Sequence, residues 1–424
     1  MLLLIFFSVV PTFAQCRIDR RISRARKVMR QYWLVVALLL FAAIPVYAAN
    51  FNFPNSPPPS CSQNSSNNYT CSTLTLNAGD TLTVASGLVV NVTINGDFTA
   101  YAGVKINENG TASNLNILVS GITTTNVTSV VRANISSVAN GSVINIGDGN
   151  NFVGSIQTKD AAINVGDNTN IQGSLTTTVS GVITVGNRSS VSGGLTTFTG
   201  AINVGANSTT GALISTSAGA ITTGDFSVIN GKISTGAGAV TIGSDSKVLG
   251  SISTSVGAIT TGARSNVSGK INNLDTSSAG AVTIGAGGVV GGSIVTGAGA
   301  VTLGANAEAA GIATQDGAIT AGASSRVKGS LCTGNSGAIT VGAGSIVDGN
   351  VITQTAGAIT VEANAKVVGI AKVEKAGALS VAASATVGTI KSSIQCADVV
   401  TPPPSTPPGP PVIKSREWRQ LFMR

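Results

Sequence analysis

Apolar residues alternate with polar or small residues in short stretches along most of the chain, and glycines separate these stretches. The segment 337–356, GAITVGAGSIVDGNVITQTA, shows the pattern: Ile339 and Val341 share one face, and Val347 and Val351 stand two residues before and after a glycine. Such alternation over three to five residues predicts short β-strands joined by tight turns. β-Branched residues and glycine dominate, and apolar residues do not recur at helical spacing, so the pattern argues against helices.

This pattern recurs thirteen times, with a mean spacing of about 19.6 residues between equivalent apolar residues. The intervals are 18 to 20 residues, except one of 23. The aligned residues are Ile144, Ile163, Ile183, Ile202, Ile221, Val240, Ile259, Val282, Val301, Ile319, Ile339, Ile359 and Leu379. A unit this short cannot bury its apolar face alone, so the units must stack, at about 4.8 Å per unit. The sequence therefore predicts an all-β fold, a parallel β-solenoid (β-helix) of about 13 regular coils of about 20 residues.

The regular repeats fill residues 141–396, and residues 73–140 alternate similarly without a clean period. We interpret 73–140 as irregular N-terminal coils, since terminal repeats are commonly atypical. Small Ala, Val and Ile residues are expected inside, and glycines are expected to permit left-handed or tight backbone at the corners. The one insertion among the regular repeats is 272–279.

The beginning of the chain reads as an export signal. Residues 29–49, MRQYWLVVALLLFAAIPVYAA, have one basic residue, an apolar run, a breaking proline and small residues at an A-x-A-like site. We interpret 29–49 as a signal peptide and 1–28 as an over-extended start of the reading frame. The alternative is an uncleaved anchor, although the apolar run of about 16 residues is shorter than the roughly 20 needed to span. Export to the periplasm or the bacterial cell surface is the expectation.

Export permits disulfides. Cys61 and Cys71 lie ten residues apart in a polar loop, CSQNSSNNYTC, within an N-terminal segment 50–72. We predict a disulfide between them that staples the start of the fold. Cys332 and Cys396 are about three repeats apart, so no direct bridge between them is expected unless the tail folds back, and their state is left open. Residues 397–424 form a proline-rich linker and a basic tail, interpreted either as a docking peptide or as a solvated tail.

Composition excludes several classes of function. The chain has no His, which removes His-based catalytic triads and His-ligated zinc. The net charge of +8 is misleading, because from residue 50 onward 18 basic and 16 acidic residues nearly cancel, so no nucleic-acid partner is expected. Single acidic residues at turns are expected to make local backbone hydrogen bonds; they are Asp167, Asp225, Asp245 and Asp348. We expect no enzyme, cofactor, metal or small-molecule substrate.

One surface pattern is regular. The residue after the aligned apolar position is Asn145, Asn164, Asn203, Ser380 or a threonine; the threonines are Thr184, Thr222, Thr241, Thr260, Thr283, Thr302, Thr320, Thr340 and Thr360. Stacking would align them in a ladder on one lateral face. The ladder is a candidate surface for binding a carbohydrate or another surface, or for binding ice, but β-propensity alone also favours threonine there.

Parts of the sequence resemble two known protein families. The phrases CSQNSSNNYTCSTLTLNAGDTLTV, INGDFTA and SNLNILVSG, followed by GAITVG coils, resemble the repeat region of MshQ-type proteins of mannose-sensitive haemagglutinin (MSHA) pilus biogenesis. The coils also resemble bactofilins, which are polymer-forming cytoskeletal β-solenoids. The resemblances imply a pilus-associated or polymer-forming role and bring no catalytic residues.

The expected function is therefore that of an exported, non-enzymatic structural solenoid. An exposed last coil would present unpaired strand edges, so end-to-end self-association is the expected interaction, in a cell-envelope or pilus setting. The alternative is an adhesin that uses the lateral Thr/Asn face, and ice binding is the least favoured reading.

Overall fold

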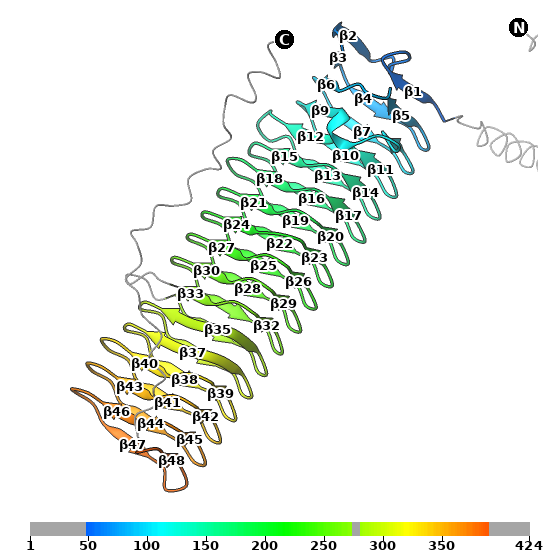
Figure 1. Cartoon of the computed structure of the whole chain (residues 1–424). Helices are drawn as coiled ribbons and strands as arrows, with labels where there is room; N and C mark the ends of the chain where they lie inside the picture. The colour runs from blue at the N-terminus through cyan, green and yellow to red at the C-terminus, as the bar shows by residue number, and fades with distance from the viewer. Residues whose placement is uncertain (1–47, 274–279, 390–424) are drawn as a thin grey trace, which may run out of the picture. The chain divides into compact units, whose positions relative to one another are not determined.

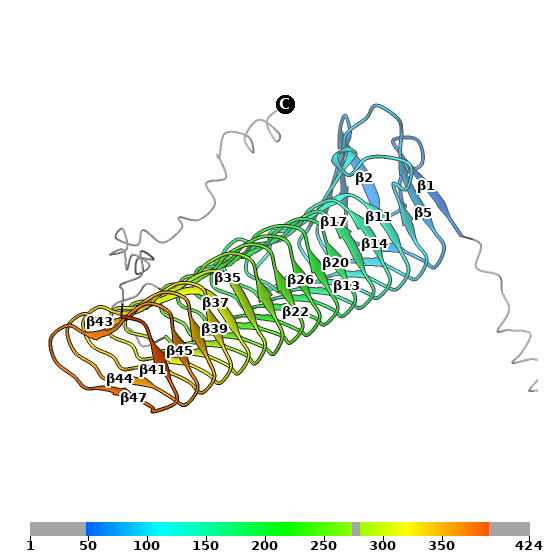
Figure 2. The same cartoon turned by 60° about the horizontal axis from the view of Figure 1, so that its bottom comes forward.

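The computed structural model describes residues 48–273 and 280–389, all within one compact unit. These residues form a rod of stacked coils (Figures 1 and 2). Each coil contributes strands to three faces, named face 1, face 2 and face 3 in chain order, and successive coils pair in parallel. The predicted parallel β-solenoid is thus confirmed. The segment 1–28, most of the signal 29–49, positions 274–279 of the insertion and the tail 397–424 lie outside the described residues.

Face 1 is a sheet of 16 strands. They are β4 (Leu74–Leu76), β7 (Phe98–Ala100), β10 (Thr123–Thr125), β13 (Ile144–Ile146), β16 (Ile163–Val165), β19 (Ile183–Val185), β22 (Ile202–Val204), β25 (Ile221–Thr223), β28 (Val240–Ile242), β31 (Ile259–Thr261), β34 (Val282–Ile284), β36 (Val301–Leu303), β38 (Ile319–Ala321), β41 (Ile339–Val341), β44 (Ile359–Val361) and β47 (Leu379–Val381).

Faces 2 and 3 are joined where two long strands, β35 (Val289–Thr296) and β37 (Glu308–Thr314), run through the corner between them. The other strands of face 2 are β1 (Asn50–Phe53), β5 (Thr81–Val84), β8 (Lys105–Ile106), β11 (Val130–Arg132), β14 (Asn151–Val153), β17 (Asn170–Gln172), β20 (Ser190–Val191), β23 (Thr209–Thr210), β26 (Val228–Ile229), β29 (Lys247–Val248), β32 (Asn266–Val267), β39 (Arg326–Val327), β42 (Ile346–Val347), β45 (Lys366–Val367) and β48 (Thr386–Val387). The other strands of face 3 are β2 (Cys61–Ser65), β3 (Asn68–Cys71), β6 (Val90–Ile94), β9 (Leu115–Val119), β12 (Asn134–Ser137), β15 (Ile156–Thr158), β18 (Leu175–Thr177), β21 (Leu195–Thr197), β24 (Ile214–Thr216), β27 (Ile233–Thr235), β30 (Ile252–Thr254), β33 (Ile271–Asn273), β40 (Leu331–Thr333), β43 (Val351–Thr353) and β46 (Ala371–Val373).

The thirteen aligned apolar residues each open a strand of face 1, and each pairs with its counterpart in the next coil, as Ile144 does with Ile163. Three further coils precede them, because Leu74 pairs with Phe98, Phe98 with Thr123, and Thr123 with Ile144. The irregular N-terminal coils therefore belong to the same stack, and a short 3-10 helix, η1 (Ala112–Asn114), lies in one of their loops. Fifteen spacings of about 4.8 Å give a rod about 72 Å long.

The interior is less apolar than the sequence suggested. Isoleucine, valine and leucine fill most inward positions, but the third residue of many face 3 strands is a buried threonine. The hydroxyls of Thr216, Thr235 and Thr254 donate to main-chain carbonyls at the neighbouring corner, at 3.0, 2.9 and 3.1 Å. These bonds satisfy both buried partners and tie one coil to the preceding one.

Glycines serve the corners differently from the expectation. Between faces 1 and 2 the left-handed residue is usually not glycine; Phe226, for example, has φ 57°. Glycine is required at many corners because the coils approach closely: a Cβ on Gly219 would lie 1.9 Å from the carbonyl oxygen of Gly200 in the coil before. Close stacking, more than left-handed backbone, therefore explains the repeated glycines.

Candidate functional site

The predicted threonines form one file on face 1, which we call the threonine file. Each is the middle residue of its strand and pairs in register with the next coil, as Thr283 does with Thr302. Most are exposed, and Thr184, Thr340 and Thr360 are half-buried. An alanine two residues earlier also faces outward, for example Ala358 before Thr360. The file therefore offers hydroxyl and methyl groups on a surface whose strands carry no charged residue.

The acidic turn residues make a different kind of contact from the one expected. Asp167 Oδ1 accepts a hydrogen bond from the main-chain N–H of Asn187 at 2.7 Å, and Asp225 Oδ1 accepts one from Ser244 at 2.7 Å. Both donors belong to the next coil, so each carboxylate links two stacked coils instead of bonding within its own turn.

Two further acidic residues form ion pairs between coils. Asp245 lies 2.6 Å from Arg264, and Asp348 lies 2.9 Å from Arg326. The hydrogen bond from Arg264 lowers the pKa of the Asp245 carboxyl below its usual range. Within 48–273 and 280–389, no group of three or more His, Cys, Asp or Glu residues could hold a metal ion.

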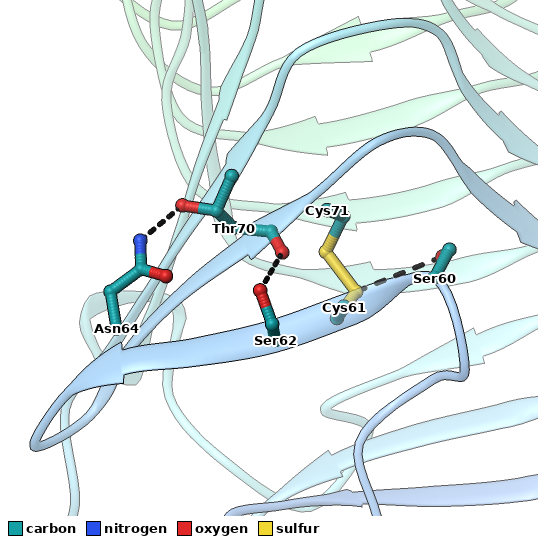
Figure 3. The surroundings of a disulfide bond; sticks show 6 residues. All are labelled: Ser60, Cys61, Ser62, Asn64, Thr70 and Cys71. Carbon is teal, nitrogen blue, oxygen red and sulfur yellow. Dashed lines mark hydrogen bonds between the residues drawn. A yellow bond between two sulfur atoms is a disulfide. The ribbon is translucent and has the colours of Figure 1, made fainter.

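The N-terminal end of the rod is sealed. Phe53 and Tyr69 are buried, with ring centroids 4.4 Å apart, and Leu74 of the first face 1 strand is also fully buried. Cys61 and Cys71 form the predicted disulfide, which closes the hairpin of β2 and β3 (Figure 3). The apolar interior is therefore covered at this end.

The strand edges at this end are also blunted. β2 pairs antiparallel with β3, and its register shifts between Gln63 and Ser65, which is typical of edges that resist further pairing. Next to β1, the main chain of Asn52 bonds in both directions with Ser56 at 2.9 and 2.7 Å, and Pro54 between them has no N–H to offer. On faces 2 and 3 a further coil would therefore find few free main-chain groups, whereas β4 of face 1 pairs only with β7 among the described strands.

The other end of the described rod is open. Leu379 and Val381 of β47 are 46% and 42% exposed, although the equivalent residues of earlier coils are buried. Val373 and Val387 on the other two faces are only partly buried. Figure 2 shows β47 at the end of the described stack, so the inward-pointing residues of this coil have no further described coil to cover them.

Sequence analysis missed a groove on face 3, across β6, β9, β12 and β15, with a volume of about 290 Å³. Its asparagines, Asn91, Asn116 and Asn134, lie at unequal spacing in the irregular coils, so no period revealed them. Only the register of the strands shows that they are stacked.

Cys332 is 3% exposed and takes part in a disulfide, so it is not a reactive thiol; Cys396 lies outside the described residues. No helix in the described ranges is long and apolar enough to cross a membrane. Comparisons with protein-family models, with curated proteins and with solved structures found no match.

Proposed function

We propose that the protein is an exported, non-enzymatic structural rod that associates end to end through its last coil and serves as a cell-surface or pilus-associated scaffold. The observation that carries the association is the contrast between the ends: Leu74 is fully buried, whereas Leu379 is 46% exposed. The signal-like segment 29–49 supports export. The resemblance to MSHA pilus biogenesis proteins supports the setting.

The sealed first coil limits how copies meet. A head-to-tail stack would need free strand edges on all three faces at both ends, and on faces 2 and 3 the described N-terminal end offers few. Two copies therefore join last coil to last coil, about a two-fold axis that makes the contact identical on both sides. Among the described residues, β46, β47 and β48 have no strand paired on their outer side and supply the edges, and Leu379 and Val381 supply apolar area.

Sedimentation velocity and negative-stain electron microscopy of the purified protein test this proposal. We expect paired rods of about twice the single length, and Leu379→Lys should shift them to single rods. The matched control is Leu249→Lys, because Leu249 is 53% exposed on the side of the rod. Single rods both for the unmodified protein and after removal of residues 397–424, or equal effects of both substitutions, would refute the pairing.

A variant that lacks residues 397–424 tests whether this tail blocks the association of the last coils. If the tail covers the last coil of its own chain, its removal strengthens the association. If single rods remain with and without the tail, association through this end is wrong.

A second candidate function is adhesion through the threonine file. It is favoured by eight threonines in consecutive coils, from Thr222 to Thr360, on an uncharged face. Substitution of Thr302 and Thr340 by lysine should abolish binding to a carbohydrate-coated surface while circular dichroism stays unchanged. Ice binding on the same file is the less favoured variant, and absence of thermal hysteresis removes it.

A further inference from the structure

The groove on face 3 is bounded by two rows of side chains that run parallel to the rod axis. The first row is Asn91, Asn116, Asn134 and Ser155, and the second row is Thr93, Leu118, Ser136 and Gln157. The floor is the strand backbone at Val92 and Ile117, whose own side chains point into the core. Four coils at about 4.8 Å each make the groove about 14 Å long between its outer strands.

The first row is held in place by hydrogen bonds between its own amides. Asn116 Nδ2 donates to Asn91 Oδ1 at 3.1 Å, and Asn134 Nδ2 donates to Asn116 Oδ1 at 3.1 Å. A carboxamide has two N–H donors and two acceptor lone pairs, so each rung keeps one donor and one acceptor for a ligand. The amides are thus already ordered, which lowers the entropy cost of binding.

The polar side chains of the second row, unlike those of the first, are not held by hydrogen bonds among the described residues. Within the described part of the chain, the side chains of Thr93, Ser136 and Gln157 make no hydrogen bond, and Leu118 adds an apolar contact between them. Hydroxyl and amide groups on this side can therefore donate to or accept from a ligand without breaking a bond inside the protein.

The groove ends where the side chains become short. In the next two coils the equivalent outward positions are Ser174 and Thr176, then Gly194 and Thr196. The rows lose their asparagine and glutamine side chains there, so the walls become lower. The site is therefore particular to the N-terminal coils and does not continue along the whole of face 3.

We propose that this groove binds a neutral glycan chain laid along the rod axis. No charged side chain lines it, which disfavours a polyanion. The floor carbonyls and N–H groups are engaged in strand pairing, which leaves none for an added peptide strand. Sugars present hydroxyls that both donate and accept, with C–H faces between them, and the groove offers amides, hydroxyls and Leu118 in the same alternation.

The proposal is independent of the association through the last coil and uses a different face from the threonine file. Isothermal titration calorimetry of the purified protein with chitotetraose and with cellotetraose tests it. We expect at least one of them to bind with a Kd of about 1 mM or tighter. A preference for chitotetraose would indicate that the amide row recognises acetamido groups, whereas equal binding would indicate recognition of hydroxyls alone.

Two substitutions localise the binding. Ser136→Trp fills the groove and should abolish binding, and Asn116→Leu keeps the volume but removes the amide and should weaken binding about tenfold, a shift of about 1.4 kcal/mol. Thr260→Leu on face 1 is the control and should bind as the unmodified protein does. If Ser136→Trp fails to fold, Gln157→Ala takes its place, since it breaks no hydrogen bond of the protein. No binding of either sugar, or full binding by the groove variants, overturns the proposal.

Discussion

The stacking of glycines at the corner between faces 3 and 1 leads to a sharp prediction for Gly219→Ala. The added Cβ would lie 1.9 Å from the carbonyl oxygen of Gly200 and 2.4 Å from its carbonyl carbon. The two coils cannot move apart easily, since Ile202 N–H donates to Ala220 across the same interface at 2.9 Å. Alanine at this position must therefore distort the corner.

The magnitude follows from two costs. Overpacking against backbone atoms costs about 3 kcal/mol, at the upper end of values for added methyl groups. The same distortion weakens the hydrogen bond from the Thr216 hydroxyl to Gly200, which contributes about 1 kcal/mol. The sum of about 4 kcal/mol corresponds to nearly a thousandfold change in a local opening equilibrium.

Hydrogen exchange measured by mass spectrometry is the suitable assay, because a stack of repeats opens locally and not as one unit. Amides of the coils around Gly219 should exchange nearly a thousandfold faster in Gly219→Ala, while coils far along the rod change little. The control is Gly334→Ala, whose Cβ would lie 3.6 Å from its nearest neighbour, the carbonyl oxygen of Gln315. Unchanged exchange in Gly219→Ala, or equal effects of both variants, would refute the reasoning.

Three further predictions concern individual contacts. Thr235→Val should lower the local opening free energy measured by hydrogen exchange by about 1–2 kcal/mol, because the carbonyl of Gly219 loses a buried donor, while Thr241→Val on the exposed face should stay within about 0.5 kcal/mol; equal losses would contradict this. Reduction of Cys61–Cys71 should weaken the N-terminal end by about 2.5–3 kcal/mol, seen as faster exchange in β1, β3 and β5, and unchanged protection there would count against the sealing role. The lowered pKa of Asp245 means that its pairing with Arg264 is present above about pH 4 and is lost as the pH falls through that lowered pKa. An NMR titration should show a higher Asp245 midpoint in Arg264→Gln, and identical midpoints would show that the pair does not form.

Much of the fold follows from the repeat length and from the alternation of inward and outward residues along each strand. A one-residue slip would place every inward isoleucine outside, so the repeat fixed both the strands of face 1 and their register, from Ile144 to Leu379. The disulfide between Cys61 and Cys71 was predicted from their short separation in a chain expected to be exported, and it is present. The same alternation placed the threonine file on the surface.

Other features depend on contacts that the repeat pattern of the sequence does not reveal. Leu74 and Leu379 are both leucine at the same position of the repeat, yet the first is fully buried and the second is 46% exposed. Thr222 and Thr223 are neighbours in sequence, but only the second is buried. The groove arises from side chains of unequal coils, which align only after the loops between them have folded.

The pairing of each coil with its immediate neighbours bears on the order in which the chain would fold if it is exported, as the proposed function requires. A chain that crosses a membrane N-terminus first would deliver the capped end, with its disulfide, before any other part. Each further 18 to 25 residues that emerge then complete one more coil on an existing edge. The capped end thus acts as a seed, and vectorial growth leaves little more than one coil of unfolded chain exposed at any moment.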